Sequence, residues 1–324
     1  GWTERVIEVL KGFIRDYPES PSRPTAMYRL GRALQSQREW KRAAAVFDDV
    51  TQIYPRFPDA ARSLVPLAEC LIEQGGDAAR RGVILLISIV DDTNDEQLFD
   101  PQARDYRLAL LRLADYYAHA SEKDEPGCLE KAASRLEDAL ALYPDDPQSP
   151  RLKFDLANCY RKSGQALRAE SQVLKQPAAR EAGLLESRQR LLRAADVFGG
   201  VITALATRDT GKTDLSALEQ SHLRAAYLHR ADCLFDVGQY DTAVEAYREA
   251  VWRYENSPVA VSASMQIVLA HQNLGQSADA RAALRRMEWL LRKIPEGSFE
   301  SEPGMSSKHY WESMVQRLAS SWVN

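Results

Sequence analysis

The chain has 324 residues, of which 45% are hydrophobic and 27% are charged, a composition typical of globular proteins with a sizeable core. Its formal net charge is -4 and its pI is about 5.9, so no overall positive charge favours nucleic acid as a partner. No apolar run approaches the roughly 20 residues that a membrane-spanning helix requires. From composition alone we therefore expect neither nucleic-acid binding nor a membrane-spanning helix.

A helix is predicted at the start of the chain, because apolar residues recur at the helical period until Tyr17-Pro18. These residues lie at one constant offset ahead of a second set, with Val6, Leu10, Phe13, Tyr17 and Pro18 corresponding to Ala43, Phe47, Val50, Tyr54 and Pro55. The first helix is therefore interpreted as the second half of a repeat. We expect its missing half, and further native sequence, to precede Gly1.

The stretch from Met27 to Pro55 predicts a helix, a short turn after Gln37 and a second helix that begins at Trp40. Small residues in both helices predict a close approach of their backbones. The pattern returns in the same register near the other end of the chain, at Tyr227, Ala231, Leu234, Gly238, Tyr240, Ala243, Tyr247 and Ala250.

This set of positions resembles the tetratricopeptide repeat, a helix pair of about 34 residues. The resemblance implies an all-α fold, a right-handed α-solenoid of about six helix pairs with a C-terminal capping helix. The proline-rich linkers Tyr-Pro-Glu-Ser-Pro and Tyr-Pro-Arg-Phe-Pro resemble those of bacterial envelope repeat proteins, such as outer-membrane assembly lipoproteins and Tol-Pal coordinators.

Four regions are expected along the chain. Residues 1–164 form an N-terminal array of the half repeat, three repeats and the first helix of a fourth, and residues 165–208 form an insertion with a long helix. Residues 215–294 form the C-terminal repeats, and residues 305–324 form the capping helix. Within the second region, 165–190 is interpreted as the insertion, because the pattern of a second repeat helix is clearest around Phe198.

The long helix carries a heptad-like apolar stripe that includes Leu184, Leu191 and Phe198. This stripe either docks on the array or mediates self-association with another copy, and the sequence leaves both alternatives open.

The candidate chemical motifs all favour structural interpretations. Cys70, Cys159 and Cys233 take equivalent places in three repeats, which indicates packing and free thiols. His229 and Cys233 lie one helical turn apart but have no second cluster to complete a metal site. The loop 209–213 lacks the earlier glycine of a phosphate-binding loop. We expect no catalytic residue, no metal and no cofactor.

The inner surface is the best candidate for function, because the resemblance implies that the first helix of each repeat lines a groove. A mixed aromatic and charged groove suits an extended peptide or a partner helix. The candidate partner-binding residues are Tyr28, Arg32, Arg62, Glu69, Asp115, Arg151, Phe154, Asn158, Arg161, Asp232, Phe235 and Met265. Phe154 stands where a known carboxylate clamp of the family needs a basic residue, so we do not expect a chaperone terminus as the ligand.

The expected function is a non-enzymatic scaffold that binds a protein or peptide partner. The linkers favour the bacterial periplasm or cell envelope, whereas free thiols suit the cytoplasm as the alternative. A second interpretation is that the chain is the helper domain of a larger enzyme or receptor whose catalytic part lies upstream of Gly1.

Overall fold

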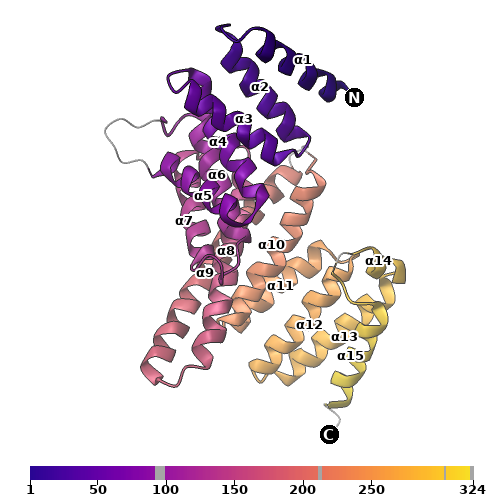
Figure 1. The fold of residues 1–324 in the computed structure, drawn as a ribbon. Coiled ribbons are helices and arrows are strands. Elements are labelled where there is room, and N and C mark those ends of the chain that lie inside the picture. Colours follow the sequence, from indigo (N-terminus) through magenta and orange to yellow (C-terminus); the bar gives the residue numbers. More distant parts are fainter. Residues whose placement is uncertain (92–98, 211–213, 303, 322–324) are drawn as a thin grey trace. The chain divides into compact units, whose positions relative to one another are not determined.

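The computed structural model describes residues 1–91, 99–210, 214–302 and 304–321, and within these ranges every regular element is an α-helix (Figure 1). The helices divide into two compact units, Gly1–Pro144 (unit 1) and Asp145–Asn324 (unit 2). The all-α tetratricopeptide solenoid expected from the sequence is confirmed. Among the described helices, none is both long and apolar enough to cross a lipid bilayer.

Unit 1 is a stack of seven described helices in which each helix packs on the next. They are α1 (Trp2–Asp16), α2 (Arg23–Ser36), α3 (Trp40–Ile53), α4 (Pro58–Gln74), α5 (Gly76–Val90), α6 (Arg104–His119) and α7 (Cys128–Leu142). In addition, α2 contacts α4 and α4 contacts α6. These contacts between alternate helices place α2, α4 and α6, the first helices of their repeats, on one inner face of the stack.

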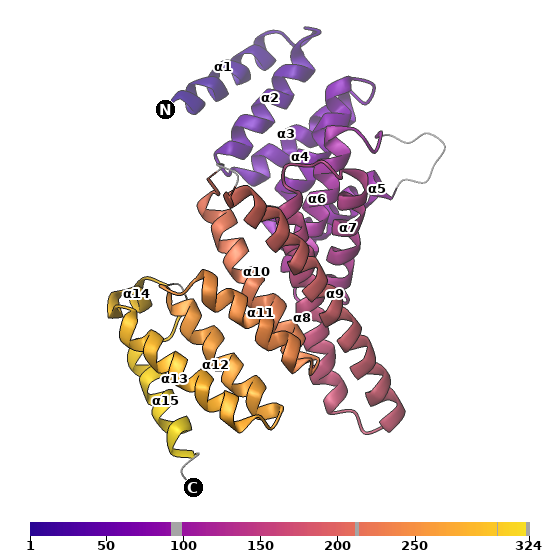
Figure 2. The same cartoon turned by 180° about the vertical axis from the view of Figure 1, so that it is seen from behind.

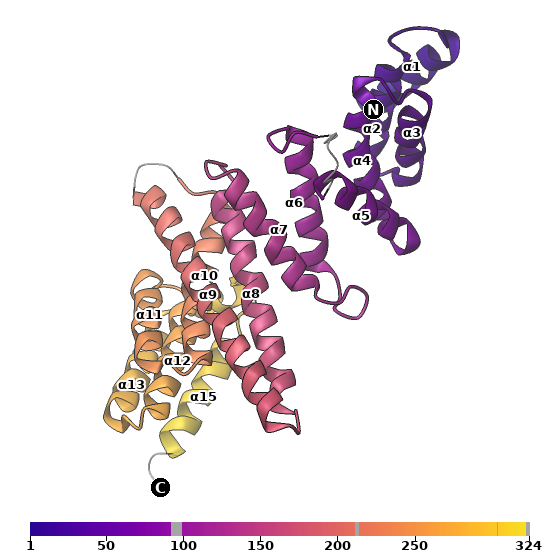
Figure 3. The ribbon, with the colours of Figure 1, turned by 90° about the vertical axis from the view of Figure 1, so that its left-hand side faces the viewer.

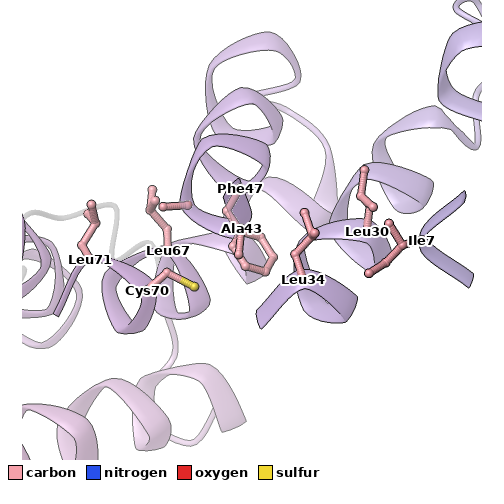
Figure 4. Packing of buried hydrophobic residues seen from close by; sticks show 9 residues of the cluster. Ile7, Leu30, Leu34, Ala43, Phe47, Leu67, Cys70 and Leu71 are labelled. Atoms are coloured by element: carbon pink, nitrogen blue, oxygen red, sulfur yellow. The ribbon is translucent and has the colours of Figure 1, made fainter. Parts of the chain in front are cut away.

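The core of unit 1 is continuous from one helix pair to the next. Phe47 and Ala43 on α3 are fully buried and lie between residues of α2 and residues of α4 (Figure 4). Ile7 of α1 joins the same cluster beside Leu30, so the half repeat buries its apolar face on α2 (Figure 4). Pro58 begins α4 at its first turn, where the missing backbone N–H costs no hydrogen bond.

Unit 2 contains the remaining eight described helices. They are α8 (Ser149–Gln172), α9 (Pro177–Thr210), α10 (Ala217–Asp236), α11 (Tyr240–Arg253), α12 (Pro258–Asn273), α13 (Ser277–Lys293), α14 (Glu296–Ser301) and α15 (Lys308–Ser321). Figure 2 shows α12 and α13 side by side with α15 next to them, and α15 packs on α13. The end of the repeat stack is thus covered by a helix, as a solenoid requires.

The segment 165–190 does not form a separate insertion. Residues 165–172 continue α8 without a break, and residues 177–190 are the first half of α9, so both helices of one pair are lengthened together (Figure 3). The two helices approach closely at small residues: a Cβ atom on Gly164 would lie 3.0 Å from Leu191 Cγ, and one on Gly183 would lie 2.0 Å from Ser171 Oγ. Neither glycine carries a side chain that would keep the two helices apart, so both helices continue through the segment in contact.

The division between the units also differs from the expected one. It falls at Pro144, before α8, whereas the sequence pattern placed a boundary after residue 164. The reason is that α8 packs along α9 and also contacts α10, which assigns the whole helix to unit 2.

The apolar stripe of α9 is used inside unit 2. Leu191 and Phe198 are fully buried, and only Leu184 stays exposed, at 36% of its surface. Of the two alternatives, the stripe therefore docks on its own chain. The side chains of Leu191 and Phe198 are not available for self-association.

Candidate partner-binding groove

A line of polar side chains runs across the inner helices of unit 1. Gln35 Nε2 on α2 donates a hydrogen bond of 2.7 Å to Glu69 Oε2 on α4. Further along, Arg112 on α6 pairs with Glu73 on α4 and donates a bond of 2.7 Å to Asp115 Oδ2. We call this set the unit 1 groove line, and it consists of Arg32, Gln35, Glu69, Glu73, Arg112 and Asp115.

The five predicted residues of unit 1 differ in how they can meet a partner. Arg32 is exposed and donates to Gln35 Oε1 over 2.9 Å, so it joins the groove line. Arg62 is also exposed and lies 3.6 Å from the carboxylate of Asp59. Tyr28 instead turns towards the core, where its ring centroid lies 5.9 Å from that of Phe47.

A second polar network joins α8 to α10 in unit 2. Arg161 donates to Asn158 Oδ1 and to Gln165 Oε1, both over 3.3 Å. Gln165 Nε2 in turn donates to Asp236 Oδ2 over 2.9 Å, and Arg168 pairs with the same carboxylate at 3.1 Å. The Arg161 guanidinium also has a buried Nε without a hydrogen-bond partner among the described residues. This arrangement holds several donors and acceptors ready on the inner face.

Several predicted residues of unit 2 serve packing. Phe154 stacks on His222 with ring centroids 4.2 Å apart, and it also meets Phe198 edge to face. Met265 is buried, so a partner cannot reach it. Phe154 was expected to line the groove. Its side chain is covered instead, because α9, which carries Phe198, packs on α8. Burial, followed by the nearby charge of Arg151, lowers the pKa of His222.

The other predicted residues of unit 2 are neither part of the polar network nor fully buried. Asp232 Oδ1 accepts a hydrogen bond of 2.5 Å from the buried Tyr247 hydroxyl. Phe235 packs edge to face on Tyr240, with centroids 5.1 Å apart. Arg151 is exposed and lies 3.7 Å from the carboxylate of Asp155. Of this group, Arg151 is the most accessible to a partner.

The polar residues that the sequence analysis missed lie one helical turn from those it named. Gln35 follows Arg32 by three residues, Arg112 precedes Asp115 by three, and Gln165 follows Arg161 by four. Extending each candidate along its own helix face at the spacing i±3 or i±4 would have found them.

The thiols have the character of core residues. All four cysteines are free and buried, and burial raises the pKa of Cys70 and of Cys233 to about 12. Thiols with such pKa values stay protonated at neutral pH and are poor nucleophiles and poor metal ligands. Across the residues that the structure describes, no group of three or more histidine, cysteine or acidic side chains is placed to hold a metal. In the loop 209–213, α9 continues to Thr210, and residues 211–213 lie outside the described residues.

Comparison with known families confirms the repeats. Models of the tetratricopeptide repeat match residues 25–56 and 228–288, which include the first copy found in the sequence and all of the second copy except Tyr227. No curated protein sequence matches the chain. The chain therefore contains tetratricopeptide repeats, whereas the more specific envelope lipoprotein or Tol-Pal type finds no support.

Solved structures with similar helix arrangements are distant. MamA of AMB-1 is 15% identical, with a TM-score of 0.41, over 76% of this chain and 95% of that one. BtubC from P. vanneervenii is 15% identical, with a TM-score of 0.42, over 85% and 96%. The TPR2AB domain of yeast Sti1 in its pHSP90 complex is 14% identical, with a TM-score of 0.37, over 92% and 100%.

The repeats define the class of protein. Solenoid arrays of such repeats present extended inner surfaces that can bind other proteins. Proteins of this class are typically non-catalytic.

Proposed function

We propose that the chain is a non-enzymatic scaffold whose inner helices bind an extended peptide or a helix of a partner protein. The observation that carries the proposal is the unit 1 groove line, in which the Gln35–Glu69 and Glu73–Arg112 contacts join polar side chains of α2, α4 and α6. A ligand that crosses these helices meets donors and acceptors at each repeat.

The groove line is suited to binding because its side chains are already held in place. Asp115 keeps 42% of its side chain exposed while its neighbour Arg112 fixes it, so a ligand orders it at a small additional cost in entropy. Both signs of charge are present along the line. The partner segment is therefore expected to carry basic and acidic residues and to bind more weakly as salt is raised.

The unit 2 network supports the same role through Asn158, Arg161 and Gln165. The groove residues that keep accessible polar groups are the ones we propose as contacts, namely Arg32, Arg62, Glu69, Asp115, Arg151, Asn158 and Arg161. The aromatic candidates Tyr28, Phe154 and Phe235 are assigned to packing.

A paired set of charge reversals tests the groove. The variant Arg32→Glu/Glu69→Lys keeps the net charge and reverses the groove line, while Lys41→Glu/Asp49→Lys makes the same exchange at exposed sites of α3. We compare the proteins that the parent and the two variants capture from the source cell. All three forms of the chain must have equal thermal stability. A partner retained by the α3 variant and lost with the groove variant supports the proposal. If both variants capture the same set of proteins as each other, the proposal is rejected.

Two finer parts of the proposal have their own tests. A place in a bacterial envelope is supported by the proline-rich linkers, and fractionation of the source cell that finds the protein only in the cytoplasm would refute it. The non-enzymatic role is supported by the repeats, and hydrolase activity that co-purifies with the parent in proportion to its amount would refute it.

A further inference from the structure

The second helices of the C-terminal repeats, α11 and α13, enclose a pocket over the first helix α12. Its volume is about 330 Å³, with α11 and α13 as walls and α12 as the floor. Figure 2 shows these three helices following one another. By their place in the repeat, α10 and α12 correspond to the inner helices α2 and α4 of unit 1, so the pocket opens on the outer side, away from the groove.

Unit 1 contains an equivalent set of helices, which allows a comparison residue by residue. Pro58 and Pro258 both begin the first helix of a pair, at α4 and α12. Gly75 and Gly275 both lie in the turn after that helix and have a positive φ, 75° and 71°. The offset between the two copies is thus constant through the pair, and α5 corresponds to α13.

The pocket is open because α13 does not approach α12 as closely as α5 approaches α4. At Gly82 on α5, a Cβ atom would lie 2.6 Å from the backbone oxygen of Ala68 on α4. The equivalent residue on α13 is Ala282, which carries such a Cβ atom and lines the pocket. Beside it, Ala283 stands where the first copy has the buried Val83, so less side-chain volume fills the space.

Two polar residues stand in the floor where the first copy has leucines. His271 and Ser264 both line the pocket with 6% and 2% of their surface exposed, whereas Leu71 and Leu64 take the equivalent places on α4. The repeat therefore accepts apolar side chains at both positions. Burying polar groups there instead costs free energy unless they find hydrogen bonds, which indicates a role in binding a ligand.

The hydrogen bonds of these two side chains are incomplete. His271 Nδ1 lies 2.6 Å from Gln276 Oε1, an atom that only accepts, so in the neutral ring Nδ1 carries the proton and Nε2 is left as an acceptor. Neither Nε2 nor the Ser264 hydroxyl has a hydrogen-bond partner among the described residues. A ligand in the pocket can supply an N–H or O–H donor to the imidazole.

The rest of the lining favours a neutral, mostly apolar ligand. Two arginines and two acidic residues line the pocket, so their charges balance. Of these, Arg286 and Glu255 form an ion pair with each other. Val251 and Ile267 supply apolar surface, and Trp252, which is 82% exposed, offers an aromatic ring at the rim. An aromatic ring in the ligand can pack on the face or the edge of this tryptophan.

We propose that this pocket binds a small neutral compound with one aromatic ring system and one N–H or O–H donor. The ring lies against Val251, Ile267 and Trp252, and the donor bonds to His271 Nε2. A volume of about 330 Å³ is within the range of small-molecule sites, which are mostly apolar with a few placed polar groups. The site is independent of the inner groove, so a small molecule binds here while the groove holds a protein.

The probe is 5-fluoroindole, and its binding to the full chain is measured from the broadening of its fluorine NMR signal. We compare it with 5-fluorobenzofuran, which has nearly the same shape but no N–H group. Saturable binding of 5-fluoroindole is expected, at least about fivefold tighter than that of the benzofuran. Absence of saturable 5-fluoroindole binding overturns the proposal, and equal affinity for the two compounds overturns the requirement for a donor.

Two leucine variants locate the site in the chain. His271→Leu and Ser264→Leu each introduce the residue of the first copy, so the fold should be kept, and thermal melting checks this. Ser264→Leu fills the pocket and should weaken the binding of both compounds at least about tenfold. His271→Leu should remove the preference for 5-fluoroindole, a change in selectivity that altered packing alone does not produce. A His271→Leu protein that keeps the preference overturns the proposal.

Two controls lie outside the pocket. His119→Leu changes a histidine of α6 whose side chain is 79% exposed, and it should leave both affinities unchanged. Arg32→Glu/Glu69→Lys reverses the groove line and should bind 5-fluoroindole like the parent. If the groove variant lost this binding, the compound would occupy the groove, and the assignment to the pocket would be wrong.

Discussion

Gly31 and Phe47 face each other so closely that a Cβ atom on Gly31 would lie 2.6 Å from Cε1 of the phenylalanine ring. The ring is fully buried and cannot move aside easily. We therefore expect Gly31→Ala to lower the free energy of unfolding by about 1–3 kcal/mol, as overpacking does in other cores. Urea unfolding followed by circular dichroism measures the change.

Gly12→Ala is the control for that substitution, since Gly12 lies on α1 in the same unit and nothing is within 4 Å of its Cβ position. There, alanine should be neutral or stabilise by up to about 1 kcal/mol, because it favours the helix. Equal effects of the two substitutions would contradict the close packing of Gly31 on Phe47.

Arg38 is strained in the turn between α2 and α3, where its φ is 58°. The corresponding residue of the second copy is Gly238, with a φ of 79°. A left-handed conformation costs a side-chain-bearing residue about 1–2 kcal/mol, which exceeds the entropy that glycine loses. Arg38→Gly should thus raise the free energy of unfolding by about 0.5–1 kcal/mol.

The reverse change, Gly238→Ala, should lower the free energy of unfolding by about 1 kcal/mol. Both values come from urea midpoints at constant m-value. An Arg38→Gly protein that is less stable than the parent would show that the arginine side chain contributes more than its backbone strain costs.

The sequence predicted the repeats well because their packing is local. Positions such as Gly31 and Phe47 recur at fixed spacing, since each helix pair contacts only its neighbours. The interpretation of 165–190 as an insertion did not take into account that Gly164 allows α9 to approach α8. That role depends on residues more than twenty positions away, which no local pattern contains.

The contacts of the candidate groove residues depend on the same kind of long-range packing. A helix-face pattern separates inner from outer residues, and in the structure Arg32 and Glu69, which it assigns to the inner side, both form hydrogen bonds with Gln35. It gives no information on which neighbouring helix covers a side chain. The packing of Phe154 on His222 therefore became visible only in the structure.

The Tyr247 hydroxyl is buried and donates to Asp232 Oδ1 over 2.5 Å, whereas the first copy has Phe47 and Arg32 at the equivalent positions. Tyr247→Phe should lower the free energy of unfolding by about 1 kcal/mol, since the carboxylate loses a donor but stays partly hydrated. The control is Tyr240→Phe, whose hydroxyl has no hydrogen bond within the described residues. Tyr247→Phe and Asp232→Asn should together cost less than the sum of the single changes, and strict additivity would contradict direct coupling.

Burial of Cys233 makes stability sensitive to alkaline pH. Its pKa rises from an ordinary value of 9.0 to about 12, so above pH 9 the thiol ionises in the unfolded chain while it stays protonated in the folded one. The unfolded state then binds fewer protons, and the stability contributed by this group, complete below pH 9, declines as pH rises towards 12. By pH 10 the decline is about 1.4 kcal/mol.

Cys233→Ala removes this contribution, although it lowers stability at every pH by leaving a small cavity. Unfolding free energies of parent and variant are measured in reductant at pH 7.5 and pH 10. Between these two pH values the parent should lose about 1.4 kcal/mol more than the variant, because other ionising groups act equally in both proteins. A difference that stays constant with pH would mean that the Cys233 thiol is as easily ionised in the folded chain as in the unfolded one.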